Sequence, residues 1–306
     1  MIHSNSEGDI YIEEMPLLLV HLREEEKGAD ARLSEVLSYA LDGYAYETAM
    51  EISAFEDYVN RWRRLEKTQN RKNPVQGRIL FAVPLGTSGI NLELYRLIRF
   101  LREHPDFLNG FVGGLLVDSE NDLYSKSAAK DLVFAANCAG CAFVGRPLVE
   151  GTRTLSNYTI VSNNLGTDLM GAYRESAAGL VKEVLGTDCV RKKCPKVLAL
   201  HASSHKTSNT YAIWDRVKEQ LPEMEIREIG LRNGTLSDCA GCPYKMCLHF
   251  GEQGSCFYGG VMVEDVYPAV READAIVMLC PNYNDALSAN LTAFINRLTS
   301  LFRTTR

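Results

Sequence analysis

The sequence predicts an α/β protein built from two doubly wound, mainly parallel sheet units. Short apolar runs alternate with helical patterns along almost the whole chain, which is typical of strands joined by crossover helices. The chain has 306 residues, and single hydrophobic cores usually stop growing at about 250–300 residues. Its 46% hydrophobic and 24% charged residues are ordinary for a globular protein. We therefore expect two ordered domains.

The first half of the chain predicts five strands separated by four helices. Strands are expected at short apolar or alternating runs, and helices where apolar residues recur every three or four positions. In chain order the expected elements are strand 16–22, helix 32–41, strand 49–55, helix 55–68, strand 78–84, a helix around 94–101, strand 111–118, helix 125–137 and strand 142–148. An irregular stretch at 151–168 and a helix at 169–185 follow.

A second, shorter α/β unit begins after a Gly-, Pro- and Lys-containing stretch at 186–196. The predicted domains are therefore 1–190 and 196–306. The expected elements of the second are strand 196–201, helix 210–221, strand 225–231, a long loop at 232–260, helix 263–272, strand 275–279 and helix 287–302. Three strands leave an open sheet edge, which the first domain or a partner chain is expected to cover.

Charge and apolar patterning exclude several classes of protein. The net charge is -6, so no basic surplus favours a nucleic-acid partner. The acidic first residues do not resemble a signal peptide, and the longest apolar runs are too short for a membrane span. We expect a cytoplasmic protein, in which the nine cysteines are metal ligands, redox groups or reduced thiols rather than disulfides.

A polar turn at Ala202–Thr210 follows the first strand of the second unit and opens a helix. Free backbone N–H groups and the positive end of a helix dipole favour an anion at such a turn. A second interpretation is an ordinary turn in which Ser208 or Asn209 caps the helix. Neither a GxGxxG motif nor a GxxxxGK[ST] P-loop occurs in the chain.

The string LHASSHKTSNT resembles the phosphate loop of the NADPH-dependent FMN reductase and iron-sulfur flavoprotein group, which has a flavodoxin-like fold. Ser203, Asn209 and Thr210 match that family's pattern, whereas His205 replaces an arginine and Ser208 a glycine. The stretches 239–256 and 273–297 resemble the family's cysteine loop and its Pro-x-Tyr loop with the following helix. The resemblance covers residues 196–306. The first domain is only loosely similar to the same fold.

The resemblance implies an FMN site formed by two loops. Its phosphate loop would comprise Ser203, His205, Ser208, Asn209 and Thr210. The isoalloxazine ring would lie against Pro281, Asn282, Tyr283, Asn284 and Asp285. Tyr283 could instead be a loop aromatic that covers the core.

Four cysteines, Cys239, Cys242, Cys247 and Cys256, have the spacing C-x2-C-x4-C-x8-C. Clustered thiolates can hold zinc or an iron–sulfur cluster, and the resemblance implies a [4Fe-4S] cluster. The x4 and x8 gaps are longer than the family's pattern, so a loop of reduced structural thiols is the alternative. The pair Cys138 and Cys141 is expected to serve packing at a helix end.

The first domain is expected to lack a phosphate site. Three consecutive glutamates, 24–26, follow its first strand and would repel a phosphate. The string LGTSGIN at 85–91 could form a weaker anion loop or a Gly- and Ser-rich helix start.

The function implied by the resemblance is an FMN-dependent NAD(P)H oxidoreductase that passes electrons to an unidentified acceptor. Because the cofactor carries the chemistry, no catalytic side chain is expected. Two alternatives are a flavoprotein electron carrier without its own substrate and a non-catalytic flavodoxin-like interaction module. The family's flavin pockets often lie at subunit interfaces, so the resemblance also implies a homodimer.

Overall fold

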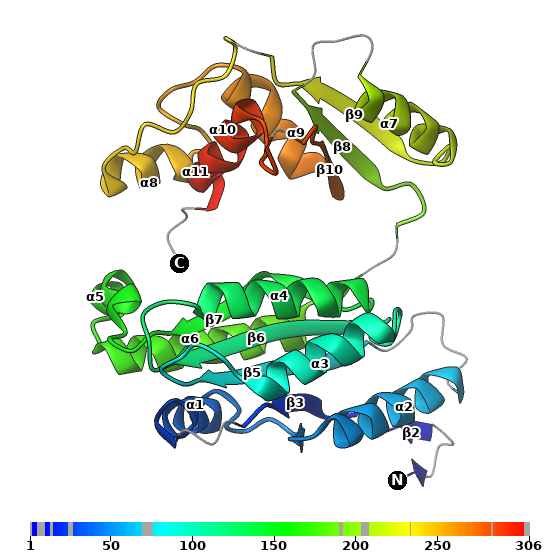
Figure 1. The fold of residues 1–306 in the computed structure, drawn as a ribbon, viewed down its shortest axis with the longest axis vertical. Coiled ribbons are helices and arrows are strands. Elements are labelled where there is room, and N and C mark those ends of the chain that lie inside the picture. The colour runs from blue at the N-terminus through cyan, green and yellow to red at the C-terminus, as the bar shows by residue number, and fades with distance from the viewer. Residues whose placement is uncertain are drawn as a thin grey trace. The chain divides into compact units, whose positions relative to one another are not determined.

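The computed structural model describes residues 2–4, 10–12, 15–23, 27–68, 76–189, 192–202, 208–232, 234–282 and 284–302 (Figure 1). The chain divides into two compact units, Met1–Val190 (unit 1) and Arg191–Arg306 (unit 2). Each unit has its own parallel sheet and its own hydrophobic core. Within the described ranges no helix is both long enough and apolar enough to cross a membrane.

Unit 1 contains a five-stranded parallel sheet with the order β4-β3-β5-β6-β7. Its strands are β3 (Leu17–His21), β4 (Tyr46–Ala49), β5 (Gly77–Leu85), β6 (Phe111–Ser119) and β7 (Ala142–Gly151). The central strands are buried almost throughout because helices cover both faces, which explains their continuous apolar runs. A separate antiparallel hairpin pairs β1 (Ile2–Ser4) with β2 (Ile10–Ile12).

Two layers of helices enclose this sheet (Figure 1). On one face α1 (Lys27–Ala40) and α6 (Leu169–Gly186) pack together, and on the other lie α2 (Ile52–Thr68), α3 (Leu92–Glu103) and α4 (Ser125–Cys138). The stretch expected to be irregular, 151–168, contains the 3-10 turn η1 (Ser156–Tyr158) and the helix α5 (Thr159–Leu165). That expectation was wrong for α5, whose buried Ser162 and partly buried Val161 pack on α6.

The strand expected at 49–55 is also wrong. The strand is β4, which ends at Ala49, and α2 begins at Ile52. The alternation of Met50, Ile52 and Ala54 suggested a strand, but Phe55, Tyr58, Val59 and Trp62 form the apolar stripe of a helix that packs into the core. Burial of this apolar stripe in the core stabilises a helix here, although the short alternating pattern alone favours a strand.

Unit 2 contains a three-stranded parallel sheet with the order β10-β8-β9. Its strands are β8 (Lys196–His201), β9 (Glu225–Gly230) and β10 (Ala275–Leu279). The helix α7 (Asn209–Glu219) covers one face, and the π-helical turn η2 (Met262–Val266), α9 (Tyr267–Glu272) and α10 (Ala289–Arg297) cover the other. The chain also forms α8 (Tyr244–Glu252), inside the stretch expected to be a loop, and α11 (Thr299–Phe302).

The two units share one strand arrangement. In unit 1 the first strand, β3, lies between the second, β4, and the third, β5. In unit 2 the first strand, β8, likewise lies between the second, β9, and the third, β10. Both sheets therefore fit flavodoxin-like units, as the sequence predicted, and unit 2 stops at three strands within the described residues.

Candidate functional site

The carboxyl edge of the unit 2 sheet brings three chain segments together. His201 at the end of β8 is in register with Leu279 at the end of β10 and with Gly230 at the end of β9. The chain leaves β8 toward β9 on one side, and β10 lies on the other. Such a change of direction in an open α/β sheet creates a crevice at the carboxyl ends of the strands, where ligands bind.

The segment after β8 contains the expected phosphate loop. Ser208 is the N-cap of α7, and its hydroxyl accepts a hydrogen bond from the Tyr211 N–H at 3.3 Å. Asn209 and Thr210 are the first two helical residues. Ser203 and His205, the other predicted contacts, lie outside the described residues. The structure thus confirms a Ser208 cap and leaves phosphate binding as a prediction.

The segment after β10 contains the expected ring-facing loop. The side-chain amide of Asn282 donates a hydrogen bond to the carboxylate of Asp285 at 3.1 Å. Asn284 and Asp285 both have left-handed backbones, with φ of 51° and 58°. Asn and Asp tolerate this conformation better than other residues that carry a Cβ. Pro281 precedes the loop, and Tyr283 lies outside the described residues.

Because β8 and β10 are neighbours, the two loops start at the same edge of the sheet. Residues 208–210 and 281–285 are separated by about 70 positions in the sequence, yet both follow strands that end in register. The structure thus brings the two predicted loops to one edge. Among the described residues the two loops form no hydrogen bond with each other, and none is needed for a ligand to reach both.

A cavity of about 720 Å³ opens beside His201, along β9. It is also lined by Arg227, Glu228, Ile229, Gly230, Arg232, Val261 and Asp265. Glu228 is engaged elsewhere, because Lys218 donates to it at 2.6 Å and Tyr211 also donates to it. Arg227 and Arg232 form no side-chain hydrogen bond or ion pair within the described part of the chain.

These two arginines were not singled out from the sequence. Both are exposed, and Arg232 directly follows β9 and Leu231. The sequence did offer one signal for Arg232, which is a basic residue just after a predicted strand. The cysteines that follow it drew the interpretation of this stretch toward a metal site instead.

Tyr258 lies near three of the four loop cysteines. Partial burial and the adjacent thiols of Cys242, Cys239 and Cys256 raise the pKa of the Tyr258 hydroxyl. The fourth cysteine, Cys247, lies within α8. All four are free thiols, and the described residues contain no group of three or more His, Cys, Asp or Glu side chains that could hold a metal ion. The predicted [4Fe-4S] cluster is therefore without structural support.

The comparison with protein families assigns this part of the chain. Residues 195–305 match the NADPH-dependent FMN reductase family. The matched range lies within unit 2 and includes both candidate loops and the four loop cysteines. The resemblance inferred from the sequence is thereby confirmed for the reductase family. Comparisons with curated proteins and with solved structures found no match.

The corresponding edge of unit 1, which lies outside the reductase match, is closed by Asn91. This side chain is 1% exposed and donates to the carbonyl oxygens of Leu22 and Pro84, at 3.2 and 2.8 Å. Its own Oδ1 caps α3 by accepting from the Leu94 N–H at 2.9 Å. Asn91 thus joins the chain after β3 to the end of β5. Of the two interpretations of 85–91, the helix start is confirmed.

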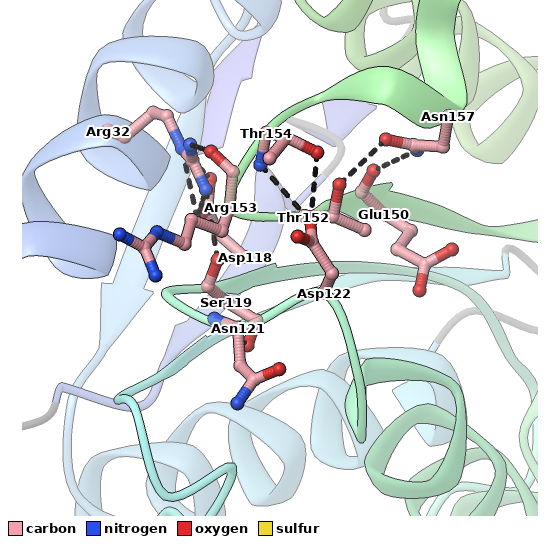
Figure 2. Close-up of polar contacts among 10 residues, drawn as sticks. All are labelled: Arg32, Asp118, Ser119, Asn121, Asp122, Glu150, Thr152, Arg153, Thr154 and Asn157. Atoms are coloured by element: carbon pink, nitrogen blue, oxygen red, sulfur yellow. Dashed lines mark hydrogen bonds and ion pairs between the residues drawn. The ribbon is translucent and has the colours of Figure 1, made fainter.

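A network of hydrogen bonds and an ion pair joins the other polar side chains at this edge (Figure 2). Arg32 on α1 donates from Nε and Nη2 to the Asp118 carboxylate at the end of β6, with a shortest distance of 2.6 Å. Asp118 is fully buried, and this burial raises its pKa although the Arg32 guanidinium opposes the shift. Arg32 also binds the carbonyl oxygens of Ser119 and Arg153.

The loops after β6 and β7 are tied to each other in the same way. Thr154 donates to Asp122 from its backbone N–H and its hydroxyl, at 3.1 and 3.0 Å, and Asn157 donates to the Glu150 carbonyl at 2.8 Å (Figure 2). These donors and acceptors satisfy one another. The three glutamates 24–26 lie outside the described residues, so the expected absence of a phosphate site in unit 1 stays a prediction.

Other cysteines match the structural expectation. Cys141 is 1% exposed, and burial raises the pKa of its thiol far above the ordinary value. Gly140 beside it has φ of 97°, and a Cβ there would collide with Asn109. The Cys138–Cys141 pair therefore marks a tightly packed helix end, although Cys138 itself is exposed.

Proposed function

We propose that unit 2 binds FMN at the carboxyl edge of its sheet and that the chain is an FMN-dependent NAD(P)H oxidoreductase. The supporting observation is the pairing of β8 and β10, which starts both candidate loops at one edge, in a stretch that matches the FMN reductase family. Unit 1, with its filled edge, would hold no flavin.

The residues at the start of α7 fit a phosphate group. The first N–H groups of a helix have no intrahelical partner, and the helix dipole favours an anion there. Ser208 caps the Tyr211 N–H, which leaves the N–H groups of Asn209 and Thr210 for a ligand. The side chains of these two residues form no hydrogen bond within the described part of the chain and can donate further hydrogen bonds.

The loop after β10 fits the polar edge of a flavin ring. The Asn282–Asp285 hydrogen bond and the two left-handed residues fix a tight turn that presents backbone and amide groups. Pro281 offers an apolar surface beside it. FMN, when bound, would supply the hydride-accepting centre. The chain's part in this proposal is to bind and orient the flavin, and no side chain is assigned a proton transfer.

The cavity beside His201 is a suitable site for the charged part of the nicotinamide nucleotide. Arg227 and Arg232 provide two free guanidinium groups, which recognise phosphate oxygens in a fork geometry. Of the two acidic residues that line the cavity, Asp265 opposes the arginines, whereas Glu228 is bound by Lys218. The cavity adjoins the end of β8, where the flavin phosphate would lie, so one dinucleotide could reach both regions.

Equilibrium titration with FMN, followed by steady-state oxidation of NADPH, tests this proposal. We expect Asn209→Ala combined with Thr210→Val to weaken FMN binding by at least about 100-fold, because it removes two hydrogen bonds to a charged group that contribute about 1.5–3 kcal/mol each. The control Asn163→Ala changes an exposed asparagine of α5 in unit 1 and should leave FMN binding unchanged. Full binding without NADPH oxidation would indicate an electron carrier instead, and no binding would contradict the proposal.

A further inference from the structure

The string Cys-Ala-Gly-Cys occurs twice in the chain, at 138–141 in unit 1 and at 239–242 in unit 2. Two cysteines can form a disulfide only where the backbone allows their Cα atoms to lie about 4.4–6.8 Å apart with the side chains facing each other. They can exchange with an external disulfide only where at least one thiol is accessible. The local structure therefore decides which of the two copies can take part in thiol–disulfide chemistry.

The unit 1 copy is fixed in a geometry that separates its two thiols. Cys138 is the last residue of α4 and is exposed, whereas Cys141 is 1% exposed. The Cys141 sulfur packs against Gly113 of β6, where an added Cβ would lie only 2.9 Å from it. The Cys141 N–H also donates to the Ala136 carbonyl at 2.9 Å. One thiol faces solvent and the other the core, so this copy is a packing element.

The unit 2 copy lies in the stretch 236–243, which belongs to no helix or strand. Cys239 is exposed and Cys242 is partly buried. Gly241 between them has φ of 70°, and no atom lies within 4 Å of the position that its Cβ would take. A left-handed glycine allows the chain to turn between the two cysteines. The open space around it leaves room for the backbone to adjust when the two sulfurs join.

Both ends of this short segment are held by the rest of unit 2. The Asp238 carboxylate accepts hydrogen bonds from the Cys239 N–H at 2.6 Å and from the Asn296 amide of α10 at 2.9 Å. Pro243, directly after Cys242, is the N-cap of α8. The two thiols are therefore kept near each other, which favours reaction between them over reaction with a second external molecule.

Tyr258 holds the second of these thiols. Its hydroxyl forms a hydrogen bond with the Cys242 thiol, and Cys239 is close by. The Tyr258 ring is itself positioned by Phe257, at 5.3 Å between ring centroids, and Phe257 contacts Phe250 of α8 at 5.6 Å. The partly buried Cys242 thus has a fixed partner beside the exposed Cys239.

The third thiol near Tyr258, that of Cys256, has a different environment. Cys256 packs against the buried residues of unit 2 and lies beside the Tyr267 hydroxyl, which is itself buried. This contact and its core packing favour a structural role for Cys256. The accessible pair in this loop is therefore Cys239 with Cys242.

We propose that Cys239 and Cys242 form a dithiol that exchanges with low-molecular-weight disulfides such as oxidised glutathione. The Cys239 thiolate attacks one sulfur of the external disulfide, whose S–S bond breaks and releases one thiol after protonation. The Cys242 thiolate then attacks the Cys239 sulfur of the mixed disulfide and releases the second thiol. Two protein thiols are thereby oxidised to one disulfide with loss of two electrons and two protons, and the reagent is reduced to two thiols. This inference does not depend on flavin binding.

Peptide mass spectrometry on the full chain tests the proposal. The reduced protein is incubated with oxidised glutathione, the remaining thiols are alkylated in denaturant, and the chain is digested with trypsin. Cleavage after Arg232 and Lys245 gives the peptide 233–245, which contains Cys239 and Cys242 and no other cysteine. We expect this peptide to be unalkylated and two hydrogen atoms lighter, and to return to the dithiol form with dithiothreitol. The peptide that carries Cys138 and Cys141 should contain no disulfide.

A matched pair of variants tests the order of the two steps. Cys242→Ser should raise the amount of glutathione bound at Cys239 by at least about tenfold, because the thiol that releases it is lost. The control Cys138→Ser removes the exposed cysteine of the unit 1 copy and should change nothing at 239–242. A dithiol that stays reduced, or a disulfide between other cysteines, would overturn the proposal. Iron or zinc bound by these thiols in the purified chain, or an unchanged adduct in Cys242→Ser, would overturn it as well.

Discussion

The carboxyl edges of the two sheets are built on the same strand arrangement and differ in what fills them. In unit 1 the buried amide of Asn91 joins the ends of β3 and β5, and the Arg32–Asp118 ion pair joins α1 to the end of β6. In the described part of unit 2, no hydrogen bond joins the loops after β8 and β10, and Arg227 and Arg232, which form no ion pair there, line the cavity along β9. The same strand arrangement can therefore have its carboxyl edge joined by buried polar contacts, as in unit 1, or have a cavity beside it, as along β9 of unit 2.

Of the changes that test this comparison, loss of the Arg32–Asp118 ion pair should have the largest effect, which is on the stability of unit 1. Arg32→Met would leave the Asp118 carboxylate buried without its partner, and we expect unit 1 to lose about 3–5 kcal/mol of unfolding free energy. Denaturant unfolding measures this, with Trp62 as the reporter of unit 1 after Trp214→Phe has removed the signal of unit 2. The double variant Arg32→Met with Asp118→Leu should recover most of the loss. A loss below about 1 kcal/mol would show that the pair does not support this edge.

The Asn91 amide gives the next largest effect. Asn91→Ala removes a helix cap and leaves the carbonyl groups of Leu22 and Pro84 without this donor, so unit 1 should lose about 2–3 kcal/mol. The exposed Asn163→Ala is the matched control, with an expected change within about 0.5 kcal/mol. Equal effects of the two variants would contradict the closure of this edge by Asn91.

The cavity arginines should produce a smaller effect, confined to unit 2. If Arg232 contacts a phosphate of the nicotinamide nucleotide, Arg232→Ala should raise KM for NADPH by about tenfold with little change in kcat. Arg216→Ala is the control, because Arg216 is exposed on α7 and does not line the cavity. An unchanged KM in Arg232→Ala, or an equal change in the control, would exclude this site for the nucleotide.

The smallest expected effect is a pH dependence confined to unit 1. Burial lowers the pKa of His21 below its ordinary value, although the adjacent Asp30 at 2.8 Å opposes the shift. The unfolded chain therefore takes up a proton at a higher pH than the folded chain. As the pH falls below about 6.5, His21 should reduce the stability of unit 1 until its folded pKa is reached. His21→Gln should flatten this part of the pH profile, and an unchanged slope would contradict it.

The sequence was sufficient for most of the strands because buried parallel strands are nearly continuous apolar runs. It also placed the two loops of unit 2, since their motifs follow directly after β8 and β10. Contacts between residues that are far apart in the sequence could not be predicted from it. Arg32 and Asp118 are 86 positions apart, and nothing local marks them as partners. The prediction of a strand at 49–55 was wrong because an alternation of apolar and polar residues over only a few positions also fits the start of a helix.

The closure of unit 1 by Asn91 could not be inferred either. In the sequence, Asn91 is an ordinary N-cap residue after a Gly- and Ser-rich turn. Its second role depends on the distance between the ends of β3 and β5, which only the folded sheet sets. Local patterns therefore predicted where the loops begin. Which side chain lies between the strand ends could be seen only in the structure.

The stoichiometry of FMN binding tests the contrast between the two units most directly. Titration of the full chain, followed by flavin fluorescence and by quenching of Trp214, should give one FMN per chain. Asn209→Ala with Thr210→Val should weaken that binding by at least about 100-fold, and Asn91→Ala should leave it unchanged. Absence of flavin binding, or binding that survives the unit 2 variant, would contradict the account.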